Sequence, residues 1–263
     1  MKDILVTGAF GGMGLATVKA LCRQGYRVFA LDLKTDEPTE NVIPVEADIT
    51  SEEAVGEAVE KVRQYTDSLC GIIHFAGIYM LDSLVEMDSK SFRRIVEVNL
   101  CSVFLVNKGF ISLLSDGGRI IITTSELAPL DPLPFTGIYA VTKGALDKYA
   151  YSLRMELQLL GIHVSVIRAG AVNTGMLGDS TDALDAFCDK TELYTCNADR
   201  FKKIVEDVEA RHISTEKIAK KVLKILKKKK PSFAYSINRN PLLLLMNALP
   251  KRLQLWIIRV VLK

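Results

Sequence analysis

The sequence predicts an α/β protein in which one doubly wound parallel sheet lies between two layers of helices. Three observations predict this fold: short β-branched segments alternate with helix-length segments, a glycine-rich turn follows the first strand, and no Pro/Ser-rich linker interrupts the series. Alternating strands and helices form a parallel sheet with helices on both faces. We therefore expect a single three-layer α/β/α domain over residues 1–240.

Seven short apolar segments are expected to form the strands, and longer segments with helical apolar spacing lie between the first six of them. The strands are expected at 3–7, 27–32, 42–47, 71–76, 119–124, 163–168 and 233–237. The fourth and fifth helices are expected to be long, at about 89–114 and 138–160, and a lysine-rich helix is expected at 215–230. This order of elements predicts both the sheet and its covering helices.

Two segments depart from the strand–helix alternation. Between 173 and 213 the pattern weakens into small, polar and acidic residues before a helix resumes near Asp199, so we expect an irregular substrate loop. Residues 241–263 are apolar and basic and predict a C-terminal helical extension. Polar residues interrupt this tail too often for a membrane-spanning helix.

Composition limits the possible functions. Of the 263 residues, 49% are hydrophobic and 25% charged, which indicates a soluble globular protein, and a net charge of +3 gives no reason to expect a nucleic-acid partner. The five cysteines include no C-x-x-C pair and the three histidines are scattered, so no disulfide framework and no metal site are expected. The chain enters a strand at once, without a secretion signal, and a cytoplasmic location is expected.

The segment ILVTGAFGGMG has the pattern of a phosphate-binding turn. Gly8, Gly12 and Gly14 stand where the chain needs positive φ, close approach to a pyrophosphate and tight helix packing. The helix that follows offers unpaired N–H groups to phosphate oxygens. A dinucleotide is therefore the expected ligand.

An acidic residue indicates which dinucleotide is bound. Asp32 ends the second strand, close to the spacing at which a carboxylate accepts hydrogen bonds from the adenine ribose. Because a carboxylate repels a 2′-phosphate, NAD is expected rather than NADP. Lys34 lies nearby and keeps NADP as the alternative.

The segment YAVTK places Tyr139 and Lys143 four residues apart, on one face of the fifth helix. An ammonium group beside a phenol favours the phenolate, so this spacing predicts a lowered pKa for Tyr139. A tyrosine tuned in this way is suited to proton transfer.

Taken together, these motifs resemble those of the short-chain dehydrogenase/reductase family over residues 1–240. The matching segments are TGAFGGMG, EADIT, HFAG, VEVNL, TTSELA, YAVTK and RAGAVNT, in the family's order. The resemblance implies a Rossmann fold and an NAD(P)-dependent oxidoreductase that interconverts an alcohol and a ketone. It also implies a homo-oligomer, because related proteins often pair through their fourth and fifth helices.

The same resemblance assigns residue roles. Tyr139 would be the general acid/base, Lys143 would tune it and hold the nicotinamide ribose, Ser125 would donate to the substrate oxygen, and Asn99 would hold a water that links Lys143 to solvent. The cofactor-binding residues would be Gly8, Phe10, Gly11, Gly12, Met13, Gly14, Asp32, Asp48, Ile49, Ala76, Gly77, Tyr139, Lys143, Gly170, Val172 and Thr174.

The sequence also departs from the family pattern. Ser125 precedes Tyr139 by fourteen residues where thirteen is commoner, which makes Thr124 the alternative donor. His74 and Phe75 replace the usual amides before Ala76, and Ala169 replaces a proline. None of these changes removes a proton-transfer group, so an active enzyme is expected.

Apolar residues in the 173–213 segment and in the loop after the fifth strand suit an apolar alcohol or ketone, or else they pack that segment onto the core. They are Met176, Leu177, Leu184, Phe187, Leu193, Tyr194, Phe201, Leu127, Leu130, Leu133 and Phe135. The tail resembles the extensions of family members that act on steroids, retinoids and other lipids. It would contact a membrane, cover the substrate pocket or form a dimer contact.

Two other functions share parts of this pattern. A nucleotide-sugar epimerase or dehydratase has the same turn and Tyr/Lys pair but usually a longer C-terminal domain. A non-catalytic dinucleotide-binding regulator would not need Asn99, Ser125, Tyr139 and Lys143 together.

Overall fold

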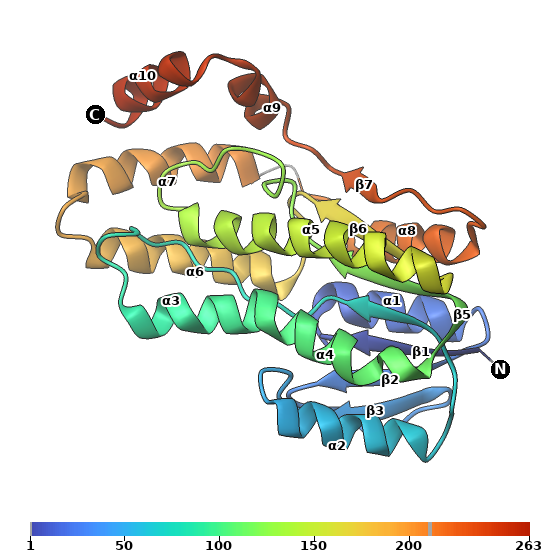
Figure 1. Cartoon of the computed structure of the whole chain (residues 1–263). Helices are drawn as coiled ribbons and strands as arrows, with labels where there is room; N and C mark the ends of the chain where they lie inside the picture. Colours follow the sequence, from blue (N-terminus) through green and yellow to red (C-terminus); the bar gives the residue numbers. More distant parts are fainter. Residues whose placement is uncertain (1, 210–211) are drawn as a thin grey trace.

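Seven parallel strands form one sheet in the computed structural model, which describes residues 2–209 and 212–263 (Figure 1). Their order is β3-β2-β1-β4-β5-β6-β7. The strands are Lys2–Thr7 (β1), Tyr26–Asp32 (β2), Val42–Glu46 (β3), Leu69–His74 (β4), Leu114–Thr123 (β5), His163–Ala169 (β6) and Ala234–Ile237 (β7). The strand order reverses between β1 and β4, and ligands of doubly wound sheets bind at the carboxyl ends of such neighbours.

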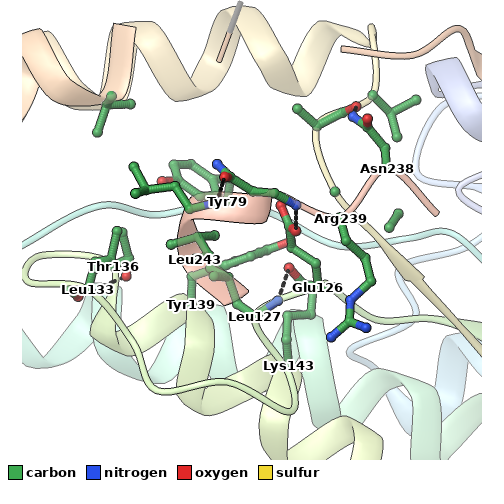
Figure 2. Close-up of a pocket in the computed structure, with 18 of the residues that line it drawn as sticks. Tyr79, Glu126, Leu127, Leu133, Thr136, Tyr139, Lys143, Asn238, Arg239 and Leu243 are labelled. Atoms are coloured by element: carbon green, nitrogen blue, oxygen red, sulfur yellow. Dashed lines mark hydrogen bonds between the residues drawn. The ribbon is translucent and has the colours of Figure 1, made fainter. Parts of the chain in front are cut away.

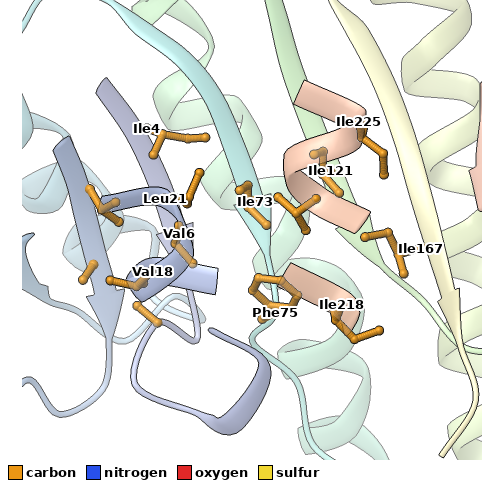
Figure 3. Close-up of a cluster of buried hydrophobic side chains, with 14 of the residues drawn as sticks. Ile4, Val6, Val18, Leu21, Ile73, Phe75, Ile121, Ile167, Ile218 and Ile225 are labelled. Atoms are coloured by element: carbon orange, nitrogen blue, oxygen red, sulfur yellow. The ribbon is translucent and has the colours of Figure 1, made fainter. Parts of the chain in front are cut away.

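Helices cover both faces of the sheet because alternate strand residues are apolar on both sides. On one face, α1 (Gly12–Cys22) and α8 (Thr215–Lys227) bury side chains against β1, β4, β5 and β6 (Figure 3). On the other face, α2 (Glu52–Arg63), α4 (Ser102–Phe110) and α5 (Gly137–Leu157) pack over the sheet. This confirms the doubly wound three-layer fold.

The fourth helical segment is interrupted around Asn99. It runs as α3 (Ser89–Val96), a π-helical turn at Glu97–Cys101, α4 and a 3₁₀ turn at Ile111–Leu113. π-turns within helices often mark functional sites, and this one contains Asn99. By length and composition Ser89–Leu113 is apolar enough to cross a membrane, but Val106 and Phe110 are fully buried against the sheet in the core of this fold.

The expectation of an irregular loop was wrong for the first half of the 173–213 segment, while the helix expected near Asp199 is confirmed. Residues Gly175–Lys190 form α6 and Thr195–Glu209 form α7. Leu184, Phe187 and Phe201 from these helices are buried in one apolar cluster with Leu262 of the tail. The few large apolar residues in this segment therefore stabilise two helices because they pack against the C-terminal tail. This contact joins residues far apart in the sequence, so local sequence does not reveal it.

The C-terminal extension continues from β7 as two short helices, which lie above α7 in the view of Figure 1. They are α9 (Pro241–Ala248) and α10 (Lys251–Leu262), and Pro250 lies between them. The helix α10 packs on α7, where the side-chain N–H of Asn197 donates to the carbonyl oxygen of Leu262 over 2.6 Å. The helical extension was predicted, and its attachment to α7 could not be seen from the sequence.

Candidate active site

The glycine-rich turn has room for backbone alone. Gly8 adopts φ +64°, and a side chain there would meet the backbone nitrogen of Ala76 at 2.6 Å. A side chain at Gly14 would collide with the carbonyl oxygen of Gly8, and one at Gly12 would meet Thr174 at 2.9 Å. The chain therefore passes from β1 into α1 with its N-terminal N–H groups accessible, as a phosphate site requires. Gly11 is the N-cap of this helix and carries no side chain that could cover those N–H groups.

Asp32 is held against this turn. Its Oδ2 accepts the backbone N–H of Phe10 at 3.0 Å, and its Oδ1 accepts that of Leu33 at 2.8 Å. The predicted ribose-binding carboxylate therefore also fixes the position of the turn, a role that sequence spacing did not indicate.

The second acidic residue on the predicted adenine side is engaged locally. Asp48 accepts both the backbone N–H and the hydroxyl of Thr50, and these hydrogen bonds lower the pKa of the Asp48 carboxyl group. The side chain of Ile49 is buried in the core against α2, so its backbone is the part left to face a cofactor. Phe10 packs against the core on the α1 side of the sheet.

The predicted proton-transfer groups come together at the end of β5 and the start of α5. Tyr139 and Ser125 both line the same cavity, and the side chain of Ser125 acts to lower the pKa of the Tyr139 phenol. The alternative donor, Thr124, is turned toward Asp147, whose Oδ1 lies 3.4 Å from its hydroxyl. The loop between β5 and α5 absorbs the extra residue in the Ser–Tyr spacing, and Phe135 in it adopts φ +65°.

Lys143 lies beneath the tyrosine, with its Nζ 5.6 Å from the centre of the Tyr139 ring. Asn99 is fully buried beside it and exchanges two hydrogen bonds with the backbone of Ile78, at 2.8 and 2.9 Å. A side chain on Gly77 would meet Asn99 Oδ1 at 3.1 Å and Lys143 Nζ at 3.3 Å. The absence of a side chain at Gly77 therefore leaves space next to the ammonium group for a small polar ligand atom.

The predicted direction of the Tyr139 pKa shift was wrong. Burial raises the pKa of Tyr139 to about 12, and the hydrogen bond from Ser125 opposes this only partly. Burial also lowers the pKa of Lys143 to about 8. The sequence argument considered only the attraction between ammonium and phenolate, whereas loss of solvent disfavours the charged form of both groups.

These groups form the floor of a cavity of about 590 Å³ with mostly apolar walls (Figure 2). Met13, Gly77, Gly170, Val172 and Thr174 line it together with Ser125, Tyr139 and Lys143. The other predicted cofactor residues lie beside it, at the carboxyl ends of β1 to β4: Gly8, Phe10, Gly11, Gly12, Gly14, Asp32, Asp48, Ile49 and Ala76.

The tail forms one wall of this cavity. Leu243 and Met246 of α9 and Ile257, Ile258 and Leu262 of α10 all line it. Of the three roles considered for the tail, the structure therefore supports that of a cover over the cavity.

The apolar residues predicted to contact substrate divide into two groups. Leu127, Leu133 and Phe201 line the cavity. Leu184 and Phe187 are buried where α6 and α7 pack on the rest of the fold, while Leu193 is exposed. Part of this set therefore lines the cavity and part packs onto the core; the side chains of Met176 and Leu177 lie outside the described residues.

Tyr79, Glu126 and Arg239 are among the cavity residues that the sequence analysis missed. The ring of Tyr79 packs on that of Tyr139, with centroids 4.9 Å apart. Glu126 and Arg239 also line the cavity (Figure 2). Burial raises the pKa of Glu126, while a hydrogen bond from Asn240 and the charge of Arg239 oppose that shift. Tyr79 lies two residues after the HFAG segment and Glu126 lies within TTSELA, directly after Ser125, so closeness to these motifs was the available signal.

The histidine expected to be structural at the end of β4 has that environment. His74 is buried, its Nε2 lies 2.9 Å from Asn107 Oδ1, and burial lowers its pKa to about 4. It is therefore a neutral residue of the core. No group of three metal-ligating side chains occurs within residues 2–209 and 212–263.

The residues present fit a dinucleotide. The glycine turn is a cradle that side chains would fill, Thr174 lies against it, and Lys143 lines the cavity beside Gly77. These features are separate from the apolar end of the cavity, so the site offers a polar end for a cofactor and an apolar end for a second ligand.

Comparison with known proteins agrees with this arrangement. The chain is 30% identical over 189 residues to estradiol 17-beta-dehydrogenase 2 of Mus musculus, covering 67% of this chain and 50% of that one. It is 30% identical over 193 residues to the NADPH-dependent 1-acyldihydroxyacetone phosphate reductase of Schizosaccharomyces pombe, covering 69% and 65%. The chain thus spans about half to two thirds of these relatives. With the 3-ketodihydrosphingosine reductase of Bacteroides thetaiotaomicron it shares 26% identity, covering 88% and 85%.

Solved structures share the fold. A short-chain dehydrogenase family protein from Francisella tularensis superposes with a TM-score of 0.75 at 23% identity, covering 90% of this chain and 97% of that one. A short-chain dehydrogenase from Burkholderia cenocepacia in complex with NADP gives a TM-score of 0.74 at 23% identity, covering 97% of both chains. The family model described as short chain dehydrogenase matches residues 2–185, and this chain belongs to that family.

Proposed function

We propose that this protein is an NAD-dependent oxidoreductase that interconverts an apolar secondary alcohol and its ketone. One observation carries the proposal: Tyr139, Ser125 and Lys143 together line the floor of an apolar cavity, next to a glycine cradle suited to a dinucleotide. A carbonyl oxygen that accepts hydrogen bonds from both hydroxyls would lie where a proton can reach it.

Tyr139 would donate its proton to the carbonyl oxygen during reduction and receive one from the alcohol during oxidation. Because burial raises its pKa to about 12, the phenol carries its proton at neutral pH and is ready to act as an acid. Ser125 would donate its hydroxyl to the same oxygen and stabilise the negative charge that develops there.

Lys143 would stabilise the phenolate left after proton donation. Its ammonium group is buried near the Tyr139 ring, where weak solvent screening strengthens electrostatic interactions. It would also hold ribose hydroxyls of the cofactor through the open space beside Gly77. Asn99 would fix the backbone of Ile78 and hold a water in the proton path to solvent, as proposed for its family position.

The cofactor would lie along the carboxyl ends of β1 and β4. Its diphosphate would be held by the N–H groups at the start of α1, its adenosine ribose by Asp32, and its carboxamide end by Thr174 and Val172. When bound, the nicotinamide ring supplies or accepts the hydride. The carboxylate of Asp32 supports NAD rather than NADP.

An apolar, lipid-like substrate is favoured by the walls of the cavity. The tail helices α9 and α10, which form the roof of the cavity, contribute leucine, isoleucine and methionine side chains. Leu127, Leu133 and Phe201 also line the cavity. The names of the three relatives given above refer to a steroid, an acylated glycerol derivative and a sphingoid ketone, which points to the same substrate class.

The two competing functions are less well supported. A nucleotide-sugar epimerase or dehydratase needs room for a second nucleotide, whereas α9 and α10 close the cavity with apolar side chains. A non-catalytic regulator gives no reason for Tyr139 and Ser125 to line one cavity next to a buried lysine.

We also propose a homo-oligomer in a reducing, cytoplasmic compartment. Phe92, Phe104, Val141 and Met155 are exposed on α3, α4 and α5, the helices through which we expect pairing. The five cysteines are all free. Light scattering of the full chain tests the assembly, and a monomer at all concentrations would contradict it.

A substrate screen tests the proposed activity. The purified protein is mixed with reduced NAD and ketones of the steroid, retinoid, bile-acid and long-chain classes, and with NAD and the corresponding alcohols, while absorbance of the reduced cofactor is followed. Turnover of apolar but not of small polar substrates is expected. No turnover of any class by a folded, NAD-binding protein would contradict the proposal.

A further inference from the structure

The last two helices have a second apolar face that the cavity does not use. While Leu243, Met246, Ile258 and Leu262 point to the pocket side, other apolar side chains of the same helices are exposed. These are Leu245 (62%), Leu253 (40%), Leu255 (67%), Trp256 (60%) and Val260 (57%), which we call the outer tail face; Leu242 (51%) and Val261 (48%) are also exposed but lie at the rim of the cavity.

The concentration of these residues is unusual for a surface. Among the described residues, 19 large apolar side chains are exposed, and seven of them lie within residues 242–261. Single exposed apolar residues are normal, whereas a large group of them marks a surface that binds a protein or a membrane.

The charge of the tail distinguishes between a protein and a membrane as the partner of the outer tail face. Residues 241–263 contain Lys251, Arg252, Arg259 and Lys263 and no acidic residue, and all four basic residues are exposed. Lys251 is paired with Asp131 of the loop after β5, which fixes the start of α10. A two-fold contact between two outer tail faces would bring basic residues against basic residues with no acid between them. An anionic surface complements them.

We propose that the outer tail face docks the protein on an anionic lipid bilayer. An amphipathic helix of this kind lies in the interface, with its apolar side chains among the acyl chains and its basic residues at the phosphate groups. Trp256 is suited to the same depth, because an indole ring has an apolar body and one N–H donor. Binding of this kind is peripheral and depends on salt.

Docking in this way would place the roof of the cavity at the lipid surface. The side chains that line the cavity and those of the outer tail face belong to the same two helices, so only the thickness of α9 and α10 would separate substrate from bilayer. This step rests on the proposed function: an apolar alcohol or ketone dissolved in the membrane would pass into the cavity without crossing water.

Flotation with vesicles tests the docking without reference to turnover. The full chain is mixed with phosphatidylcholine vesicles, with or without phosphatidylglycerol. We expect flotation with the anionic vesicles only and release by added salt. Leu255→Glu and Trp256→Glu should abolish flotation, and Arg252→Ser and Arg259→Ser should each weaken binding by about five-fold.

Leu159→Glu is the matched control, because Leu159 is 83% exposed in the turn after α5, outside the tail. It should float like the unchanged protein, and thermal unfolding should show that all variants are folded. Failure of the unchanged protein to float, or flotation of Trp256→Glu to the same extent, would overturn the proposal. If Trp256→Glu instead only splits a self-associated protein into smaller species, the outer tail face is a protein contact and the proposal is wrong.

Discussion

The carboxylate of Glu126 accepts the backbone N–H of Asn240 over 2.6 Å, which ties the residue after Ser125 to the start of the tail. Asn240 is the N-cap of α9 and accepts the N–H of Leu242 at 2.9 Å. A second tie lies further along, where Asn247 Oδ1 accepts the backbone N–H of Asp131 at 2.7 Å. The loop that carries the proposed catalytic serine therefore also holds the roof of the cavity.

Replacing Glu126 by alanine should loosen this roof. The change leaves the N–H of Asn240 without its acceptor, at a cost of about 1–3 kcal/mol to local stability. We expect faster hydrogen exchange over residues 241–262 and a raised KM for an apolar substrate, with NAD affinity unchanged. The control is Glu52→Ala, which removes an exposed ion pair with Lys108 on the opposite face of the sheet. Unchanged exchange in the tail would show that Glu126 does not hold it.

Removing the Tyr139 hydroxyl with Tyr139→Phe should lower kcat by between about a hundred-fold and ten-thousand-fold, the usual effect of losing a general acid. The ring still packs on Tyr79, so NAD affinity should change little. Tyr149→Phe is the matched control: it lies on the same helix, and its hydroxyl accepts a hydrogen bond from Asn107. Comparable turnover by Tyr139→Phe and the unchanged enzyme would exclude Tyr139 as the proton donor.

Local signals were enough to predict much of the fold and the polar end of the site. The strands are rich in β-branched residues, and the turn after β1 is recognised by its glycines. Both can therefore be identified from the sequence without tertiary information. Tyr139 and Lys143 could be paired because helix geometry fixes their relative position. Ser125 was identified at its strand end, although the loop to Tyr139 is longer than usual.

Features that depend on distant contacts could not be predicted. The helix α6 has few large apolar residues, and its burial depends on α7 and on Leu262, far along the chain. The partner of Glu126 lies more than one hundred residues away in the tail. The pKa of Tyr139 depends on how deeply the surrounding chain encloses it, which helix spacing does not reveal.

The pKa of Lys143 predicts a pH dependence. Because burial lowers it to about 8, the side chain is an ammonium at neutral pH and loses its charge at a lower pH than an ordinary lysine. Without that charge the phenolate left by proton donation is less stable, so kcat/KM for ketone reduction should fall above a pH of about 8. Lys143→Arg should move this fall to higher pH, because a guanidinium stays charged. The same profile in both proteins would mean that another group causes the fall.

Asp32 is expected to favour NAD over NADP through its negative charge. Because Asp32 also holds the glycine-rich turn in place, the test must remove the charge and keep the hydrogen bond to Phe10. An alanine would also remove the acceptor for the Phe10 N–H, whereas Asp32→Asn keeps an oxygen at that position. The asparagine variant should bind NADP more tightly by about ten-fold or more, because repulsion between the carboxylate and the 2′-phosphate is lost. Its affinity for NAD should fall less. Calorimetric titration with both cofactors measures the ratio, and Asp67→Asn serves as control because Asp67 is exposed and belongs to no predicted site. An unchanged affinity ratio in Asp32→Asn would show that Asp32 does not discriminate between NAD and NADP. The exposed Lys34, which follows β2, would then be the next residue to test.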